Sequence, residues 1–279
     1  MEESINKPGY DAFLLKIVAI AGMAMQHSAL VLGEVIPVAL HFPLQLAGGL
    51  TFPIMAFLLV EGYRHTSNVK RYMGRLFLWG VISQVPHTMA FGMPLGFPTF
   101  NIMFTLFMSL LAIVLYDRMK RRGLFVFLFV LICLATALCD WGIIGPVVVF
   151  IYHTVKTERL RRIVAPVLAA SYGLVTAVLI GILVGIVIVF IGIADPAAAE
   201  ALTETLNTAG TTDVRMGATF AGILFPIGSF LVVPLVLRYN GERGRSLKYM
   251  FYAFYPLHLL ILALIAYAVG ISDLIFFAG

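Results

Sequence analysis

Charged residues are scarce in this chain. They make up 12% of its 279 residues, whereas hydrophobic side chains make up 61%, and the mean hydropathy is +0.99. A soluble domain of this length cannot hide so many apolar side chains, because much of any globular surface must face water. The scarcity of charge therefore excludes a soluble globular protein and indicates an integral membrane protein.

Cysteine is scarcer still, and its placement argues against two kinds of site. Cys133 and Cys139 are the only two cysteines in the sequence, and they have no histidine or further cysteine around them at a metal-ligand spacing. Six residues apart on a helix, they point to different faces. We therefore expect no disulfide and no metal site, only two small buried apolar residues.

Segments of about ten alternating residues, the pattern of a membrane β-barrel, are also missing. The apolar runs extend instead over about 20 residues, the length of helix that crosses a hydrocarbon core of roughly 30 Å. The first run has no small-residue cleavage site and leads into a second one, so we expect a retained span and not a signal peptide. The sequence thus predicts an all-α integral membrane protein.

We predict a single polytopic domain over residues 1–279, built as a bundle of about nine transmembrane helices. The spans are expected near residues 11–33, 47–64, 70–91, 100–117, 123–139, 141–155, 163–194, 215–238 and 247–270. Basic residues gather in the even-numbered connections and acidic residues in the odd-numbered ones. Because positive loops stay cytoplasmic, the N-terminus is expected inside and the C-terminus outside. This topology also accounts for the net charge of +5 without a nucleic-acid partner.

Ionisable side chains at membrane depth are costly, so each one is a candidate for function. His27 lies well inside the first span, at the end of the stretch "LKIVAIAGMAMQH". Lys16 lies about three helical turns before it on the same face, which also carries Ile20 and Met23. That face is expected to form a path from the cytoplasmic surface to the imidazole. The alternative is that His27 only joins two helices by a hydrogen bond.

Further polar groups lie near the third and fifth connections, on the outer side. Asn101, Thr105 and Ser109 follow one another at helical spacing in "NIMFTLFMS", a stripe typical of packing or of a site. Asp140 lies in the tight turn "CDWGIIG", either as a helix cap or as an acid of the outer polar cluster.

Prolines are expected to kink two spans. Pro53 should bend the second span, just after Gly48, where the missing side chain leaves room for a backbone or a ligand. Pro256 should bend the last span, where Tyr255 and His258 share one side.

Two other patterns are expected to be structural. Glu61, about one turn inside the cytoplasmic end of the second span, should pair with Arg64 or Arg75. The stretch "DPAAAEALTETL" places Asp195 as a helix cap before a proline at the first helical position. It predicts a short helix over the mouth of the bundle, within an external segment at about residues 195–213.

Six motifs occur in order over about residues 14–262: "LKIVAIAGMAMQH", "FPIMAFLLVEGYRHTSNVKRYMGRL", "ISQVP", "NIMFTL", "DWGIIG" and "FYPLHLLIL". Together they resemble the TraX family, bacterial membrane proteins named for the enzyme that N-acetylates conjugative pilin. That family is similar in turn to transmembrane acyltransferases that use cytoplasmic acetyl-CoA. The resemblance implies transfer of an acetyl or other short acyl group from acyl-CoA to an amine or hydroxyl acceptor, at the plasma membrane of a bacterium or archaeon, without a metal.

The resemblance also implies a set of catalytic residues. His27 corresponds to the histidine of the family's Asp-His pair, and the other positions that match family motifs are Asn101, Thr105, Asp140 and His258. The chain departs from the family at Gln26, where an Asp is expected, and at Gln45 and Gly49, where Arg is expected. A glutamine carries no charge, so either another acid such as Asp140 stabilises the imidazolium or the chemistry is altered or lost.

A mechanism follows from the resemblance and the predicted topology. The CoA is expected to bind basic groups near the cytoplasmic side, namely Lys16, Arg64, Arg71 and Arg75, together with Tyr255 of the last span. His27 would act as general base, and Asn101 and Thr105 would donate hydrogen bonds to the oxyanion. The acceptor is left open among a peptide, a sugar and a lipid, and so is a homo-oligomeric state.

Three alternatives remain at this stage. Kinked helices and polar groups at membrane depth also suit a transporter or flippase, although the sequence shows no inverted repeat. An inactive relative that only binds acyl-CoA is a second alternative. A haem, quinone or metal site on His27, His87 and His258 is a third, and it requires two of these imidazoles to face each other.

Overall fold

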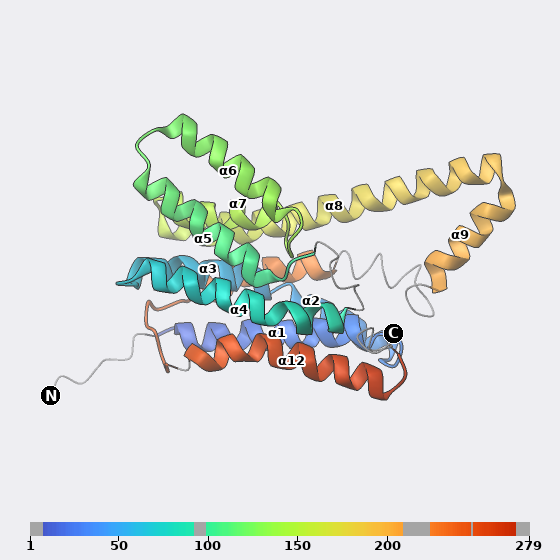
Figure 1. The fold of residues 1–279 in the computed structure, drawn as a ribbon, viewed down its shortest axis with the longest axis horizontal. Coiled ribbons are helices and arrows are strands. Elements are labelled where there is room, and N and C mark those ends of the chain that lie inside the picture. Colours follow the sequence, from blue (N-terminus) through green and yellow to red (C-terminus); the bar gives the residue numbers. More distant parts are fainter. Residues whose placement is uncertain (1–7, 92–98, 209–223, 247, 272–279) are drawn as a thin grey trace.

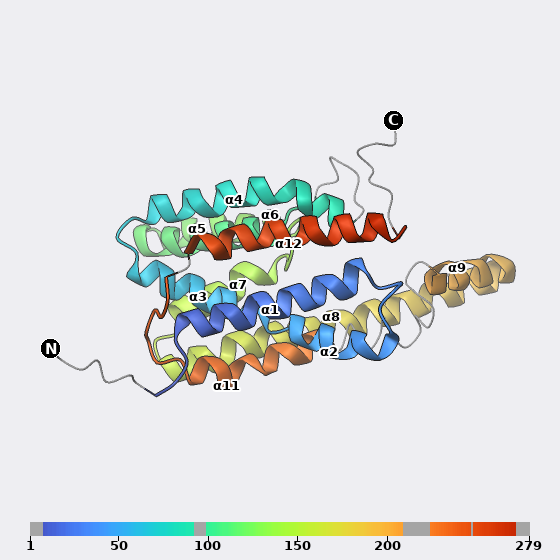
Figure 2. The same ribbon diagram turned by 90° about the horizontal axis from the view of Figure 1, so that it is seen from below.

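The structure is a computed structural model that describes residues 8–91, 99–208, 224–246 and 248–271. Over these residues the chain is helical, with two isolated bridges and no strand. Most helices run along one long axis of the molecule, as Figures 1 and 2 show. The predicted all-α class is therefore confirmed for this part of the chain.

The described part of the chain forms the following helices. The first six are α1 (Ala12–Val31), α2 (Val38–Gly48), α3 (Thr51–His65), α4 (Val69–Ala90), α5 (Ile102–Arg118) and α6 (Arg122–Thr136). The remainder are α7 (Ile144–Thr154), α8 (Glu158–Ala194), α9 (Pro196–Thr208), α11 (Val232–Leu237), which follows helical turns at 224–230, and α12 (Lys248–Ala268).

Four helical segments among the described residues are long and apolar enough to cross a membrane. They are Ala12–Val31, Ala39–His65, Glu158–Ala194 and Tyr249–Ala268. Three shorter apolar helices accompany them, at Arg122–Thr136, Ile144–Thr154 and Leu224–Leu237. The chain is thus a helical membrane protein, whereas the count of nine spans and the inside–outside orientation stay predictions.

The helices pack around a common apolar core. Helix α1 packs against α2, α3 and α12, while α4 lies between α12 and α5. Helix α7 contacts α3, α5, α6 and α8, and it contributes the fully buried Tyr152. The four connections that carry the basic clusters, α3–α4, α5–α6, α7–α8 and α11–α12, all lie at the end of the bundle where α1 begins (Figure 1, left).

The second predicted span differs from the expectation at Pro53. Helices α2 and α3 are separated by a turn at Gly49 and Leu50, so that Pro53 lies in the first turn of α3. An amide in the first turn has no intrahelical acceptor, so proline loses no hydrogen bond there and need not kink the helix. The interruption of the helix falls at the turn before the proline. Helix α2 was expected only as a connection.

Helix α9 was predicted with its cap. The Asp195 carboxylate accepts hydrogen bonds from the amides of Ala197 and Ala198, at 3.0 and 3.2 Å. The helix packs back against the end of α8, far from the rest of the bundle, and does not cover its mouth (Figure 2). The remainder of the predicted external segment, to residue 213, and the start of the span predicted at 215 lie outside the described residues.

Candidate active site

A cavity of about 590 Å³ lies between α1, α3, α4, α5, α8 and α12. Its lining is mostly apolar, with side chains such as Met23, Phe52 and Trp141. A few polar residues interrupt this lining: Gln26, His27, Thr51, His87, Asp140, Tyr172, Thr176 and Tyr255. An apolar cavity with a few convergent polar groups is the usual form of a small-molecule site.

His27 is held by a histidine from the other end of the chain. Its Nδ1 atom lies 2.8 Å from Nε2 of His258, and the two rings are nearly parallel, at an interplanar angle of 7°. Nδ1 of His258 lies 2.8 Å from the carbonyl oxygen of Phe254, one turn earlier in α12. The predicted site residues His27 and His258 are therefore brought together.

This arrangement fixes which nitrogens carry hydrogen. A carbonyl oxygen only accepts, so Nδ1 of His258 donates to Phe254, and its Nε2 is an acceptor in the neutral ring. Nδ1 of His27 must then donate to that Nε2. The remaining nitrogen of His27, Nε2, keeps its lone pair. The network thus leaves His27 prepared to accept a proton.

The face of α1 that leads to His27 borders the cavity. Ile20, Met23 and His27 all line it. Lys16 lies one turn before Ile20, and its Nζ is 5.3 Å from the ring centroid of Phe251, which is also a lining residue. The predicted face therefore runs from the edge of the cavity to its imidazole.

A second imidazole lines the same cavity and pairs with a carboxylate. His87, which is 2% exposed, places Nε2 3.4 Å from Oδ2 of Asp140, whose side chain is 39% exposed. Nδ1 of His87 is buried without a hydrogen-bond partner among the described residues. The ring of Phe91 contacts both imidazoles, with centroids 5.5 Å from that of His27 and 5.0 Å from that of His87.

Asp140 is positioned by the start of α5. Its amide donates to the carbonyl oxygen of Phe100 at 2.9 Å, and its own carbonyl accepts a short hydrogen bond from the Thr105 hydroxyl. The turn continues through Trp141, which has a φ of 65°, a conformation that is uncommon outside glycine. The Trp141 ring stacks on Phe52, with centroids 4.3 Å apart. The acid expected to assist His27 thus contacts His87.

Asn101 and Thr105 hold the scaffold and do not line the cavity. The side chain of Asn101 caps α5 by accepting from the amide of Met103, and it donates to the carbonyl of Gly80 and to Oε1 of Gln84, at 2.8 and 2.9 Å. The hydroxyl hydrogen of Thr105 is used by Asp140. The donors predicted for the oxyanion are therefore engaged elsewhere in this structure.

The basic residues expected to hold CoA fall into two groups. Arg71 and Arg75 are on the first turns of α4, where the Arg75 guanidinium lies 5.6 Å from the ring centroid of Tyr72. Arg64 lies in a separate ionic cluster, where it donates to Glu61 at 3.3 Å and to the carbonyl of His153 at 3.3 Å.

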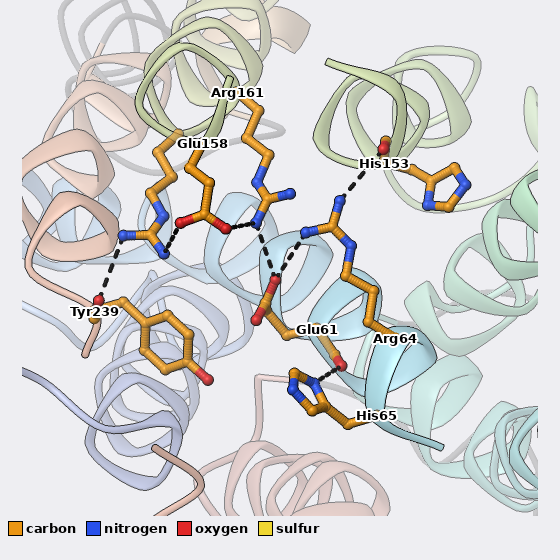
Figure 3. Close-up of polar contacts among 8 residues, drawn as sticks. Glu61, Arg64, His65, His153, Glu158, Arg161 and Tyr239 are labelled. Carbon is orange, nitrogen blue, oxygen red and sulfur yellow. Dashed lines mark hydrogen bonds and ion pairs between the residues drawn. The ribbon is translucent and has the colours of Figure 1, made fainter. Parts of the chain in front are cut away.

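Figure 3 shows this ionic cluster, which joins α3, α7, α8 and the segment after α11. Glu61 accepts from Arg161 as well as from Arg64, and Arg161 also binds Glu158. Nearby, burial and then the Glu61 carboxylate raise the pKa of Tyr239 to about 12, so its phenol stays neutral at physiological pH. The predicted pairing of Glu61 with Arg64 is confirmed.

The positions that depart from the family pattern have a local explanation. Gly48 lies directly against the side chain of Gln26, and a Cβ at Gly49 would lie within 3.0 Å of backbone atoms of Gly228. The Ser229 hydroxyl also donates to the Gly49 carbonyl at 2.9 Å. The chain between α8 and α12 thus occupies the space that an arginine at position 49 would need.

His87 is the main residue that sequence reasoning did not place in the catalytic set. It was named only in the alternative of a haem, quinone or metal site, and its partner Asp140 comes from a turn between two other helices. No residue spacing predicts such a contact. Among the described residues, no group of three or more His, Cys, Asp or Glu side chains is placed to hold a metal ion.

The fold and the cavity define a helical membrane protein with one His–His pair and one His–Asp pair around an apolar interior site. The chain belongs to the TraX protein family, whose model matches residues 12–217 and 143–266. It is 30% identical over 267 residues to the "Probable fimbrial assembly protein FimC, serogroup H1" of Dichelobacter nodosus. That alignment covers 91% of this chain and 94% of the relative. No solved structure matches the chain.

Proposed function

We propose that this protein is a membrane acyltransferase that moves an acetyl or other short acyl group from cytoplasmic acyl-CoA to an amine or hydroxyl acceptor. The observation that carries the proposal is the state of His27, whose Nδ1 is committed to His258 while the ring lines the cavity. Membership in the TraX family supports the same reaction class.

His27 is the general base in this proposal. Its Nε2 takes the proton from the acceptor as the nucleophile attacks the thioester carbon, a role typically worth about 10²–10⁴-fold in rate. His258 holds the ring in the tautomer that leaves Nε2 free, as a carboxylate does in other catalytic pairs. His258 positions the ring without a negative charge. In this proposal the site therefore does not need an acid at position 26, where this chain has Gln26.

The donor enters from the end of the bundle where the basic connections gather. Lys16, Arg71 and Arg75 hold the phosphates and adenine there. Arg64 is paired with Glu61 and would have to leave that ion pair to bind the CoA. Eleven residues of helix separate Lys16 from His27, about 16 Å along α1. The pantetheine arm follows this face, past Tyr255, into the apolar cavity.

The acceptor and the setting are proposed from the relative and the predicted topology. The name of the Dichelobacter nodosus protein concerns fimbrial assembly, which favours a peptide acceptor over a sugar or a lipid. We place the protein in the plasma membrane of a prokaryote, with its basic connections in the cytoplasm.

The test is thiol release from acetyl-CoA by the protein in nanodiscs. A short peptide with a free N-terminus, a hexose and phosphatidylethanolamine are supplied in turn as acceptors. His27→Gln should lower the turnover at least 100-fold, with the Kd for acetyl-CoA unchanged by calorimetry. His41→Gln is the matched control, because within the part of the chain that the structure describes His41 bonds only to the carbonyl of Gly33 and does not line the cavity.

Two results would count against the proposal. One is a protein that binds no acetyl-CoA, which would restore the transporter as the leading alternative. The other is turnover that survives His27→Gln at the level of the control, which would leave an acyltransferase with a different base.

A further inference from the structure

The two imidazoles that line the cavity have partners of opposite character. His27 faces His258, a second imidazole, so a positive charge on either ring disfavours one on the other. His87 faces the Asp140 carboxylate, whose Oδ2 lies 3.4 Å from its Nε2, a distance at which the two groups can form an ion pair. When the surroundings of two titratable groups differ in this way, one suits the base and the other the acid.

We propose that His87 is a second catalytic residue, the general acid that protonates the departing sulfur of CoA, and that Asp140 is its positioning residue. This inference rests on the proposed function. Both imidazoles border one cavity and contact the same residue, Phe91, so a single bound thioester can meet both.

The acceptor attacks the thioester carbon while His27 Nε2 takes its proton, and a tetrahedral intermediate forms. The C–S bond then breaks, its electron pair goes to sulfur, and the proton on Nδ1 of His87 passes to that sulfur. His87 is left neutral with its remaining hydrogen on Nε2 toward Asp140. Solvent then removes the proton from His27 and restores the one on His87.

The two donors predicted for the oxyanion are already engaged. Asn101 and Thr105 use their hydrogens on Gly80, Gln84 and Asp140 and lie outside the cavity lining. Nδ1 of His87, by contrast, has no hydrogen-bond partner among the described residues although the ring is buried. A buried polar atom without a partner is costly, and a proton acceptor on the substrate would satisfy it.

The experiment compares two acetyl donors that differ in how much their sulfur needs a proton. Acetyl-CoA releases an alkyl thiol of weak acidity, near that of cysteine, whereas S-(4-nitrophenyl) thioacetate releases a far more acidic aryl thiol. His87→Gln should lower kcat with acetyl-CoA by about 100-fold and with the aryl donor by less than about tenfold. His27→Gln should lower both by the same factor, because both reactions need an activated nucleophile.

A second variant and a matched control keep the outcome clear. Asp140→Asn preserves size, and it should show the same selective loss with acetyl-CoA. His153→Gln alters another His–Asp pair, with Nε2 2.9 Å from Oδ1 of Asp117, that does not line the cavity. It should leave both donors unaffected. Thermal unfolding in detergent shows whether each variant is folded.

The possible failures can be told apart. A wild-type protein that transfers acetyl from neither donor and binds no acetyl-CoA overturns the proposed function. If transfer depends on His27 but His87→Gln and Asp140→Asn lose the same factor with both donors, or lose nothing, only the assignment of His87 as the acid is overturned.

Discussion

His27 and His258 are 231 positions apart in the chain, and their facing nitrogens are 2.8 Å apart in space. The contact joins the first described helix to the last, because α1 and α12 pack side by side (Figure 2). The orientation of the proposed base therefore depends on the docking of α12. A carbonyl of that helix, from Phe254, sets the hydrogen positions of the whole network.

Replacing His258 by phenylalanine should separate the packing of its ring beside His27 from the hydrogen bond that it accepts. Phenylalanine keeps a ring beside His27 but offers no acceptor to Nδ1. We expect kcat for thiol release from acetyl-CoA to fall by about 10–100-fold with little change in KM, because the base is misoriented while the donor still binds. His258→Gln, whose amide oxygen can accept a hydrogen bond, should retain more activity. Full activity in His258→Phe would show that the pair has no catalytic role.

The Gln26→Asp exchange restores the acid expected at this position but should not raise the turnover. Neighbouring residues on a helix do not face each other, and the side chain of Gln26 packs against Gly48. Nδ1 of His27 is already hydrogen-bonded to His258. We expect kcat within about twofold of the wild type, and Gln26→Asn serves as the uncharged control of the same length. A tenfold gain specific to Asp would mean that a carboxylate at position 26 reaches the imidazole after all.

Sequence reasoning succeeded where the information is local. The face that joins Ile20, Met23 and His27 follows from helical periodicity, and the start of α9 follows from Asp195 and its proline. It also identified the family, because the motifs that carry the resemblance occur in order along the chain.

Contacts between distant segments were not predictable in this way. The pairing of His87 with Asp140 depends on how a helix end meets a turn, and no spacing in the chain encodes it. Asn101 was expected to donate to substrate, but its partners Gly80 and Gln84 become neighbours only when α4 packs on α5. The kink predicted at Pro53 was also misplaced, because the helix is interrupted at Gly49 and Leu50 and a proline in a first turn removes no helix hydrogen bond.

The glycine at position 49 should be required for packing. An added Cβ would lie within 3.0 Å of backbone atoms of Gly228, which cannot move away as a flexible side chain does. We expect Gly49→Ala to lower the free energy of unfolding by about 1–3 kcal/mol, the usual cost of overpacking. Gly74→Ala is the control, because nothing lies within 4 Å of a Cβ there, and it should be neutral or stabilising by about 0.5–1 kcal/mol. Equal midpoints for the two variants in thermal unfolding would contradict this account.

The ionic cluster of Figure 3 gives a sharper test of burial, because two glutamates bind the same arginine in different surroundings. Glu61 has a side chain that is 12% exposed, whereas that of Glu158 is 67% exposed, and both contact Arg161, which is 5% exposed. Removing the buried carboxylate leaves a buried guanidinium poorly compensated, so Glu61→Gln should cost about 3 kcal/mol in the free energy of unfolding. Removing the exposed one leaves water to replace it, so Glu158→Gln should cost less than about 1 kcal/mol. Unfolding by SDS titration from mixed micelles measures both. If Glu158→Gln proved as costly as Glu61→Gln, the contribution of the cluster to the free energy of unfolding would depend on the number of its ion pairs and not on their burial.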